Sequence, residues 1–108
     1  MTLHGEVRIE DGGALWIMTG EIDAAVQTQV EDMLADTPAS GARRVVVDVS
    51  GVTFMDSGGL RLLYRAASVF PERPLLRGVP GHVRDLLELT GVAPLFDTDP
   101  APDASPAG

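Results

Sequence analysis

The sequence predicts one α/β domain in which a central mixed β-sheet of about four to five strands packs against α-helices. Two observations predict this class. Apolar residues repeat with a period of two in some segments and of about 3.6 in others, and both kinds of segment recur along the chain. In addition, 108 residues without cysteine suit one hydrophobic core and exclude a disulfide framework. We assign residues 1–96 to the domain and predict that residues 97–108 form a disordered, acidic tail rich in proline and alanine.

The first elements are predicted to be a β-hairpin and a helix. Residues 6–10 alternate polar and apolar, residues 14–18 are more apolar, and Asp11-Gly12-Gly13 between them is a turn signal. Asp23 then offers a carboxylate as the N-cap of a helix that ends near Thr37-Pro38. The apolar stripe of this helix falls at i, i+4, i+7 and i+8 and consists of Val26, Val30, Met33 and Leu34.

The centre of the sheet is predicted at residues 45–49, where four valines without alternation indicate a strand buried on both faces. Asp48 interrupts this run. A carboxylate there must lie at the carboxyl end of the strand, accept hydrogen bonds or carry a raised pKa. Since sites in open α/β sheets gather beyond the carboxyl ends of strands, we expect Asp48 to lie near residues 52–60.

The second half of the chain predicts a helix from Gly58, a short strand at residues 75–79, a last helix between Pro80 and Gly91, and a final edge segment at residues 92–96. The order is therefore β-β-α-β-α-β-α with a final β segment, and right-handed crossovers make the later strands parallel. The helix from Gly58 is predicted to be mostly buried, with a narrow polar stripe of Arg61, Arg65, Ser68 and Glu72.

Charge and composition exclude several classes of function. The chain has sixteen Asp and Glu residues, eight Arg and no Lys, a net charge of −8 that argues against a nucleic-acid partner. No segment reaches the roughly 18 apolar residues of a membrane span, so we expect a cytoplasmic protein without a membrane partner. His4 and His82 stand alone, which argues against a metal site, and we expect no cofactor.

Ser57 is the main candidate site residue. It lies between Asp56 and two glycines at a predicted helix N-terminus, where free N–H groups and the helix dipole suit an anion such as phosphate. Plain helix capping also explains Ser57, Asp56 and Asp23. An enzymatic interpretation would make Asp56 and Ser57 an acid and a nucleophile, but no His or Lys stands where a base is expected. We therefore predict no catalytic residues.

Two features beside Ser57, an apolar pair and an arginine, allow two interpretations each. Phe54 and Met55 are either core residues or an exposed apolar pair that marks an interface. Arg61 either belongs to a solvated helix face or contacts an acidic partner. Gly58 and Gly59 cost a helix about 1 kcal/mol each relative to alanine, and the close approach of another protein to the backbone would explain them.

The segment at residues 45–60 resembles the central signature of anti-sigma factor antagonists, members of the STAS domain family (sulfate transporter and anti-sigma antagonist). Gly20-Glu21-Ile22-Asp23 is similar to the Gly-Glu-Leu-Asp element of that family, and residues 86–92 to its late segment of helix, glycine and apolar residues. The three matches occur in family order and cover residues 5–96. The resemblance implies a single STAS-like domain.

The resemblance also implies a regulatory switch. The family's phosphorylated serine corresponds to Ser57; unphosphorylated, the antagonist binds an anti-sigma factor that is also a serine kinase, and a serine phosphatase restores this state. We expect a monomer or weak dimer. The alternative is a STAS subunit of a lipid-transport or stress-signalling assembly that docks constitutively. The predicted partner-binding residues are Asp23, Asp48, Phe54, Met55, Asp56, Gly58, Gly59 and Arg61.

Two departures from the family pattern stand out. The family commonly has Asp-Ser-Ser-Gly-Leu, whereas the residue after Ser57 here is Gly58, so a second hydroxyl is absent. A C-terminal helix found in many relatives is replaced by the proline-rich tail. The phosphoacceptor itself is retained.

Overall fold

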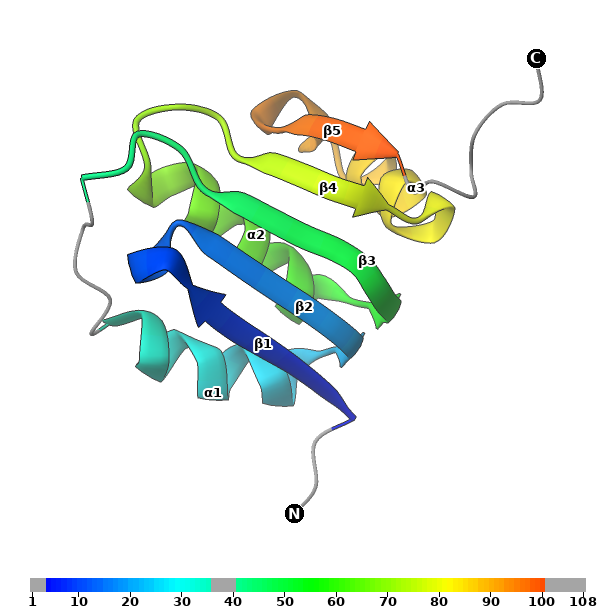
Figure 1. Cartoon of the computed structure of the whole chain (residues 1–108). Coiled ribbons are helices and arrows are strands. Elements are labelled where there is room, and N and C mark those ends of the chain that lie inside the picture. Colours follow the sequence, from blue (N-terminus) through cyan, green and yellow to red (C-terminus); the bar gives the residue numbers. More distant parts are fainter. Residues whose placement is uncertain (1–3, 36–40, 101–108) are drawn as a thin grey trace.

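A computed structural model describes residues 4–35 and 41–100 of the chain. They form a five-stranded mixed sheet in the spatial order β1-β2-β3-β4-β5, with three helices (Figure 1). The predicted fold class and element order are confirmed. The elements are β1 (Gly5–Glu10), β2 (Leu15–Ile22), α1 (Ala24–Ala35), β3 (Val46–Met55), α2 (Ser57–Val69), β4 (Leu75–Val79), α3 (Gly81–Leu89) and β5 (Asp97–Pro100).

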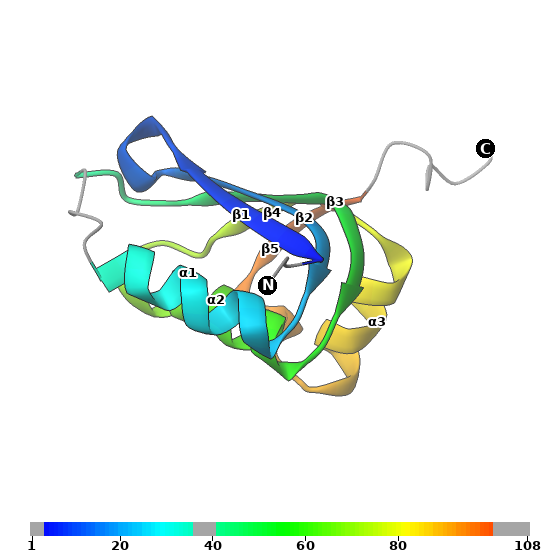
Figure 2. The same cartoon turned by 90° about the horizontal axis from the view of Figure 1, so that it is seen from below.

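The topology places the helices on one side of the sheet. β1 and β2 form an antiparallel hairpin, and β2 to β5 are parallel neighbours in chain order. Each parallel connection steps in the same direction, and because crossovers are right-handed, α1, α2 and α3 lie on the same face. Figure 2 shows α1 and α2 side by side beneath the sheet. A single core lies between these layers, with Trp16, Met18, Val47, Leu62 and Leu87 among its buried residues.

The opposite face of the sheet carries no helix of the described chain, which corrects the prediction for the central strand. β3 is central, as predicted, but Val45, Val47 and Val49 are buried on the helix side while Val46 and Asp48 are only half-buried. The valine run therefore reflects β propensity on both faces and burial mainly on one.

β3 is also longer than predicted. Ser50 and Gly51 do not end it, and the strand continues because Val52 and Met55 keep burying apolar side chains, with 3% and 7% of their surfaces exposed. This extension carries the chain from the sheet centre to Asp56, the residue before α2.

The C-terminal boundary was predicted wrongly. Residues 92–96 contain a short 3₁₀ helix (Ala93–Leu95), and Asp97–Pro100, assigned to a disordered tail, form β5, which pairs with β4. Phe96 is buried and anchors this strand, while pairing with β4 uses backbone groups and needs no apolar side chains. The domain thus reaches at least Pro100. Residues 101–108 lie outside the described residues.

The predicted helix boundaries are mostly correct. Asp23 caps α1, and Gly91, with φ of 78°, follows the last turn of α3 and ends it, as predicted. The expected end of α1 near Thr37-Pro38 lies outside the described residues.

Candidate functional site

The candidate site is the junction between β3 and α2. Asp56 separates them and has extended backbone angles, φ −119° and ψ −162°. Its carboxylate accepts a hydrogen bond from the Gly58 N–H at 2.7 Å, and its carbonyl accepts the first helical bond, from Leu60 N–H at 3.1 Å. Asp56 is therefore the N-cap of α2.

Ser57 is the first residue of α2 and is exposed. Because the cap contact runs between Asp56 and Gly58, the carboxylate satisfies a backbone donor one residue beyond the serine. Phe54, which lies next to the end of β3, is 47% exposed. The junction therefore presents a hydroxyl and an aromatic ring to solvent.

The N-terminus of α1 lies against the same junction. Asp23 caps α1 by accepting from Val26 N–H at 3.1 Å. A Cβ atom placed on Gly58 would lie 2.7 Å from both Cα and N of Ala24, which is closer than such atoms approach in proteins. The first turns of α1 and α2 therefore touch, and their positive dipole ends both lie close to Ser57.

The two glycines are explained by packing inside the protein. Both are buried, and a Cβ on Gly59 would lie 2.5 Å from Cγ of Met55 and 2.9 Å from the carbonyl oxygen of Ile22. Approach by another protein is therefore not required to explain them. Met55 is itself 7% exposed and belongs to the core, so of the predicted apolar pair only Phe54 can contact a partner directly.

The exposed face of α2 differs from the predicted polar stripe. Arg61 is exposed, as expected, but Arg65 is half-buried and Glu72 lies beyond the helix, where it pairs with Arg43 at 2.9 Å. Tyr64, which the predicted stripe did not include, is 58% exposed. The signal for it was present, since one helix face at i, i+4, i+7 and i+11 consists of Ser57, Arg61, Tyr64 and Ser68.

Asp48 does not join this site, contrary to the prediction. It is the third residue of β3, and the strand continues for seven more residues, on the order of 20 Å at about 3.3 Å per residue. Its carboxylate accepts from Ser50 N–H at 3.0 Å, from Ser50 Oγ at 2.6 Å and from Arg77 at 3.2 Å. Partial burial alone would raise the pKa of Asp48, but these bonds from Ser50 and Arg77 outweigh it and hold the pKa below its ordinary value.

Residues 4–35 and 41–100 contain neither a metal-binding cluster nor a membrane-spanning helix. They contain no group of three or more His, Cys, Asp or Glu side chains arranged to hold a metal ion. The longest helix of this part of the chain, α2, has 13 residues, fewer than the roughly 18 that a membrane span needs.

Comparisons with known proteins agree with the resemblance seen in the sequence. A family model described as "Mlab, STAS domain" matches residues 2–97. A Bordetella bronchiseptica protein named "Putative anti-sigma factor antagonist BtrV" is 28% identical over 100 residues, which span 90% of this chain and 86% of that protein. The "Anti-sigma-B factor antagonist" of Staphylococcus aureus is 27% identical over 99 residues, spanning 89% of this chain and 92% of the relative.

The fold has a counterpart among solved structures. The crystal structure of a sulfate transporter family protein from Wolinella succinogenes superposes with a TM-score of 0.69 at 16% identity. The match covers 89% of this chain and 83% of that one. At this identity the similarity concerns the fold alone.

Proposed function

The chain belongs to the STAS domain family, and from that premise we propose that it is a cytoplasmic, non-enzymatic anti-sigma factor antagonist switched by phosphorylation of Ser57. Unphosphorylated, it binds an anti-sigma factor that is also its serine kinase, and the sigma factor is released. Phosphorylation of Ser57 abolishes that binding, and a serine phosphatase restores it. The names of the two relatives support the antagonist role.

The observation that carries the proposal is the exposed hydroxyl of Ser57 on a tightly held helix start. Asp56, Gly58 and Gly59 fix the backbone around it by capping and close packing. A kinase can reach the hydroxyl because Ser57 itself is exposed. We assign the partner contact to the exposed side chains next to it, which are Phe54, Arg61 and Tyr64.

The remaining predicted partner-binding residues take supporting roles in this proposal. Asp56 and Asp23 act as helix caps, and the two glycines with Met55 let α2 pack closely on β3 and α1. They position the contact surface without forming it. Asp48 lies outside that surface, on the helix-free face of the sheet.

A phosphate on Ser57 should leave the fold intact. It adds about −1.5 to −2 charges at a helix N-terminus, where negative charge is favourable by about 0.3–1 kcal/mol. Arg61 lies one helical turn further on, so its guanidinium can pair with the phosphate. The modification therefore also removes Arg61 from the surface offered to a partner.

The same phosphate is costly in a complex. Buried against a partner it must lose its hydration, and where it faces like charge the cost reaches several kcal/mol. Each ~1.4 kcal/mol lowers affinity tenfold. Loss of docking, without a change of fold, is thus the expected effect of phosphorylation.

The packing of Gly58 also explains why position 58 does not carry a second serine hydroxyl beside Ser57. A serine at position 58 would place its Cβ against the backbone of Ala24, so the second serine common in the family does not fit this arrangement of α1 and α2. The switch that we propose therefore depends on Ser57 alone.

The decisive experiment combines phosphorylation and binding. The protein is incubated with candidate anti-sigma factor kinases and ATP, the modified residue is identified by mass spectrometry, and binding of modified and unmodified protein to each kinase is compared. Ser57→Ala should abolish the label. Ser68→Ala is the matched control, because Ser68 is an exposed serine on the same helix, and it should be labelled like the wild type.

Two results would contradict the proposal. Equal binding of phosphorylated and unmodified protein would leave a constitutive subunit of a larger assembly as the better description. A label that persists in Ser57→Ala would move the switch to another residue.

A further inference from the structure

β1 is an edge strand, and the direction of its backbone groups can be derived from its neighbours. It lies at one end of the sheet, and no other strand of the described chain pairs with its outer side. Glu21 N–H donates to the carbonyl oxygen of His4 at 3.1 Å. The backbone N–H and C=O groups of the even-numbered residues of β1 therefore point toward β2. By alternation, the N–H and C=O groups of Gly5, Val7 and Ile9 point outward.

The hydrogen bonds on the other side of β2 agree with this assignment. Val46 N–H donates to the carbonyl oxygen of Ala14 at 2.9 Å. The backbone N–H and C=O groups of even-numbered residues of β2 therefore point toward β3, and those of odd-numbered residues point toward β1. Antiparallel partners in the hairpin pair even with odd numbers, such as Arg8 with Ile17. The free edge of β1 therefore offers three residues whose donors and acceptors are available to a further strand.

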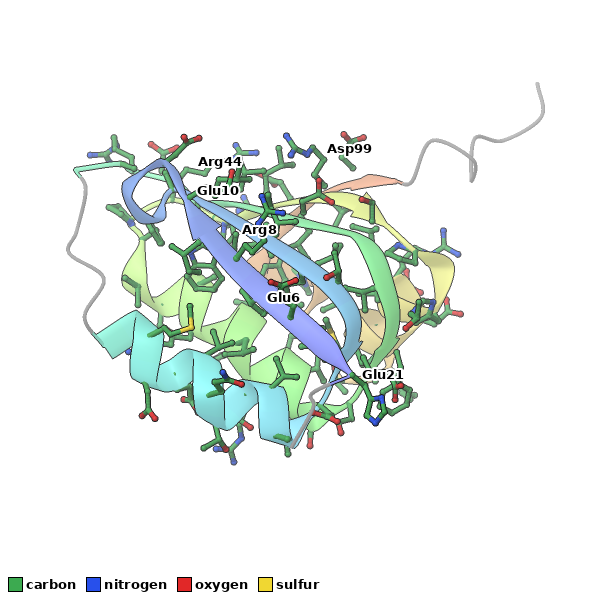
Figure 3. All side chains as sticks on the ribbon, turned by 60° about the horizontal axis from the view of Figure 1, so that its bottom comes forward. Glu6, Arg8, Glu10, Glu21, Arg44 and Asp99 are labelled. Carbon is green, nitrogen blue, oxygen red and sulfur yellow. The ribbon has the colours of Figure 1, made fainter. Side chains whose placement is uncertain are left out.

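The side chains on the helix-free face of β1 carry charges of both signs. Figure 3 shows Glu6, Arg8 and Glu10 in a row along this strand. All three alternate with the buried or half-buried Val7 and Ile9. Arg8 already pairs with Glu10 within the strand. Any strand added at this edge must place its own side chains opposite this row.

In one register, a second copy of β1 places opposite charges against the charged side chains of the first. When Val7 faces Val7 of the second copy in an antiparallel pair, Glu6 faces Arg8 and Glu10 faces His4, each twice. A shift of the register by two residues in one direction places Glu6 against Glu6 of the second copy. The same shift in the other direction places Arg8 against Arg8. Opposite charges directly across an antiparallel pair stabilise it, and like charges destabilise it.

We propose that β1 pairs antiparallel with β1 of a second copy of this chain, about a two-fold axis at Val7, so that two five-stranded sheets become one. Val7 pairs with Val7, and Gly5 pairs with Ile9 in both directions, which engages all of the outward backbone groups. A groove of about 440 Å³ between β1 and α1 keeps this edge accessible, and Met33, 44% exposed, lines it. The second copy approaches along this groove.

The opposite edge of the sheet is unsuited to the same pairing. β5 has four residues and ends in Pro100, which has no backbone N–H. A self-pair centred on Thr98 would place Asp97 against Asp99, so that like charges meet. These are features that natural proteins use to keep edges unpaired, and they leave β1 as the edge that can associate.

A charge-swap experiment tests the proposal. Sedimentation equilibrium is measured for the wild type, Glu6→Arg, Arg8→Glu and an equimolar mixture of the two variants. Each variant alone places like charges at both facing pairs, and we expect its dimerisation to weaken about tenfold. In the mixture, positions 6 and 8 of one variant again face side chains of opposite charge on the other, so dimerisation should recover. Asp99→Arg, a charge reversal on the opposite edge strand, is the matched control and should dimerise like the wild type.

Cysteine pairing tests the register. The chain has no cysteine, and residues 6 and 8 would face each other at about 4.5 Å between Cα atoms, within disulfide range. Mixing Glu6→Cys with Arg8→Cys under mild oxidation should give mainly the mixed disulfide by mass spectrometry. A wild type that stays monomeric at millimolar concentration, single variants that dimerise as well as the wild type, or a mixture no stronger than its components would each overturn the proposal.

Discussion

Helices α2 and α3 each follow a parallel strand, but their N-termini are built differently. At α2 the carboxylate of Asp56 caps the helix, and the next two glycines are buried against α1 and β3. At α3 the N-cap residue is Pro80, which makes no side-chain cap bond, and Gly81 is exposed. A Cβ atom added to Gly81 would meet only the tip of the Arg84 side chain, at 3.9 Å. Only the first of these helix starts is enclosed.

This difference shows what the proposed docking site has beyond a helix dipole. Both helices offer free N–H groups at their first turn, so the dipole alone does not distinguish them. At α2, however, Ser57 is held by a cap before it and close packing after it, while its own side chain remains exposed. A fixed backbone with one free hydroxyl is a suitable substrate for a kinase. The same changes made at both helix starts should therefore have different effects.

The largest difference is expected for glycine to alanine. Gly58→Ala places a methyl group 2.7 Å from backbone atoms of Ala24, and overpacking of about 1–3 kcal/mol, reduced by the better helix propensity of alanine, gives a net loss of about 1–2 kcal/mol. The melting temperature should fall by about 5–10 °C. Gly81→Ala meets open space and should instead stabilise the protein by about 0.5 kcal/mol. Thermal unfolding of both variants measures these changes in stability. If both variants were destabilised, or both stabilised, the two helix starts would not differ in packing as described.

The next effect concerns the cap of α2. Asp56→Ala removes the acceptor of the Gly58 N–H and should cost about 1 kcal/mol in urea unfolding. Asp56→Asn keeps an acceptor at the same position and should lose less than half as much. Equal losses for the two variants would mean that charge, and not the cap hydrogen bond, is what matters there.

Asp48 supplies a carboxylate that lies at neither helix start, so its effect should depend on pH and not on capping. Its pKa is lower in the folded protein than the unfolded value of about 3.9. The stabilisation is therefore complete above about pH 4 and disappears as pH falls through the folded pKa. Asp48→Asn should cost less than about 1 kcal/mol at pH 7, and its stability should converge with that of the wild type as the pH falls below the folded pKa of Asp48. Parallel pH profiles would contradict this.

Local patterns predicted the elements of this fold better than their ends. The turn at Asp11-Gly12-Gly13 and the strand at residues 75–79 have local signals and were correct. β5 was missed because Asp97, Thr98 and Asp99 have no apolar pattern, and only the backbone of β4 makes them a strand. The position of Asp48 was missed because the Ser50-Gly51 pair is typical of a turn, whereas β3 continues through it.

The candidate site was predictable only in part. The family motif made Ser57 the candidate phosphoacceptor, which stays a prediction, whereas capping preferences correctly predicted Asp23 and Asp56 as helix caps. The burial of Gly58 depends on Ala24, which is distant in sequence, so no local pattern could reveal that a side chain has no room there. The exposure of Tyr64 could have been predicted from the sequence, because it lies on the same helix face as Ser57 at position i+7.

The smallest effect on stability, and the strongest test of the comparison, comes from placing the same charge at the first residue of both helices. Ser57→Asp adds a carboxylate beside that of Asp56, so dipole attraction and like-charge repulsion oppose each other and stability should change by less than about 0.5 kcal/mol. Gly81→Asp has no neighbouring cap carboxylate and should stabilise slightly. If the α2 surface is the docking site, Ser57→Asp should weaken binding to the anti-sigma factor at least tenfold, a cost of about 1.4 kcal/mol, while Gly81→Asp leaves it unchanged. Equal weakening by both variants would mean that overall negative charge controls association, because neither position would then be special.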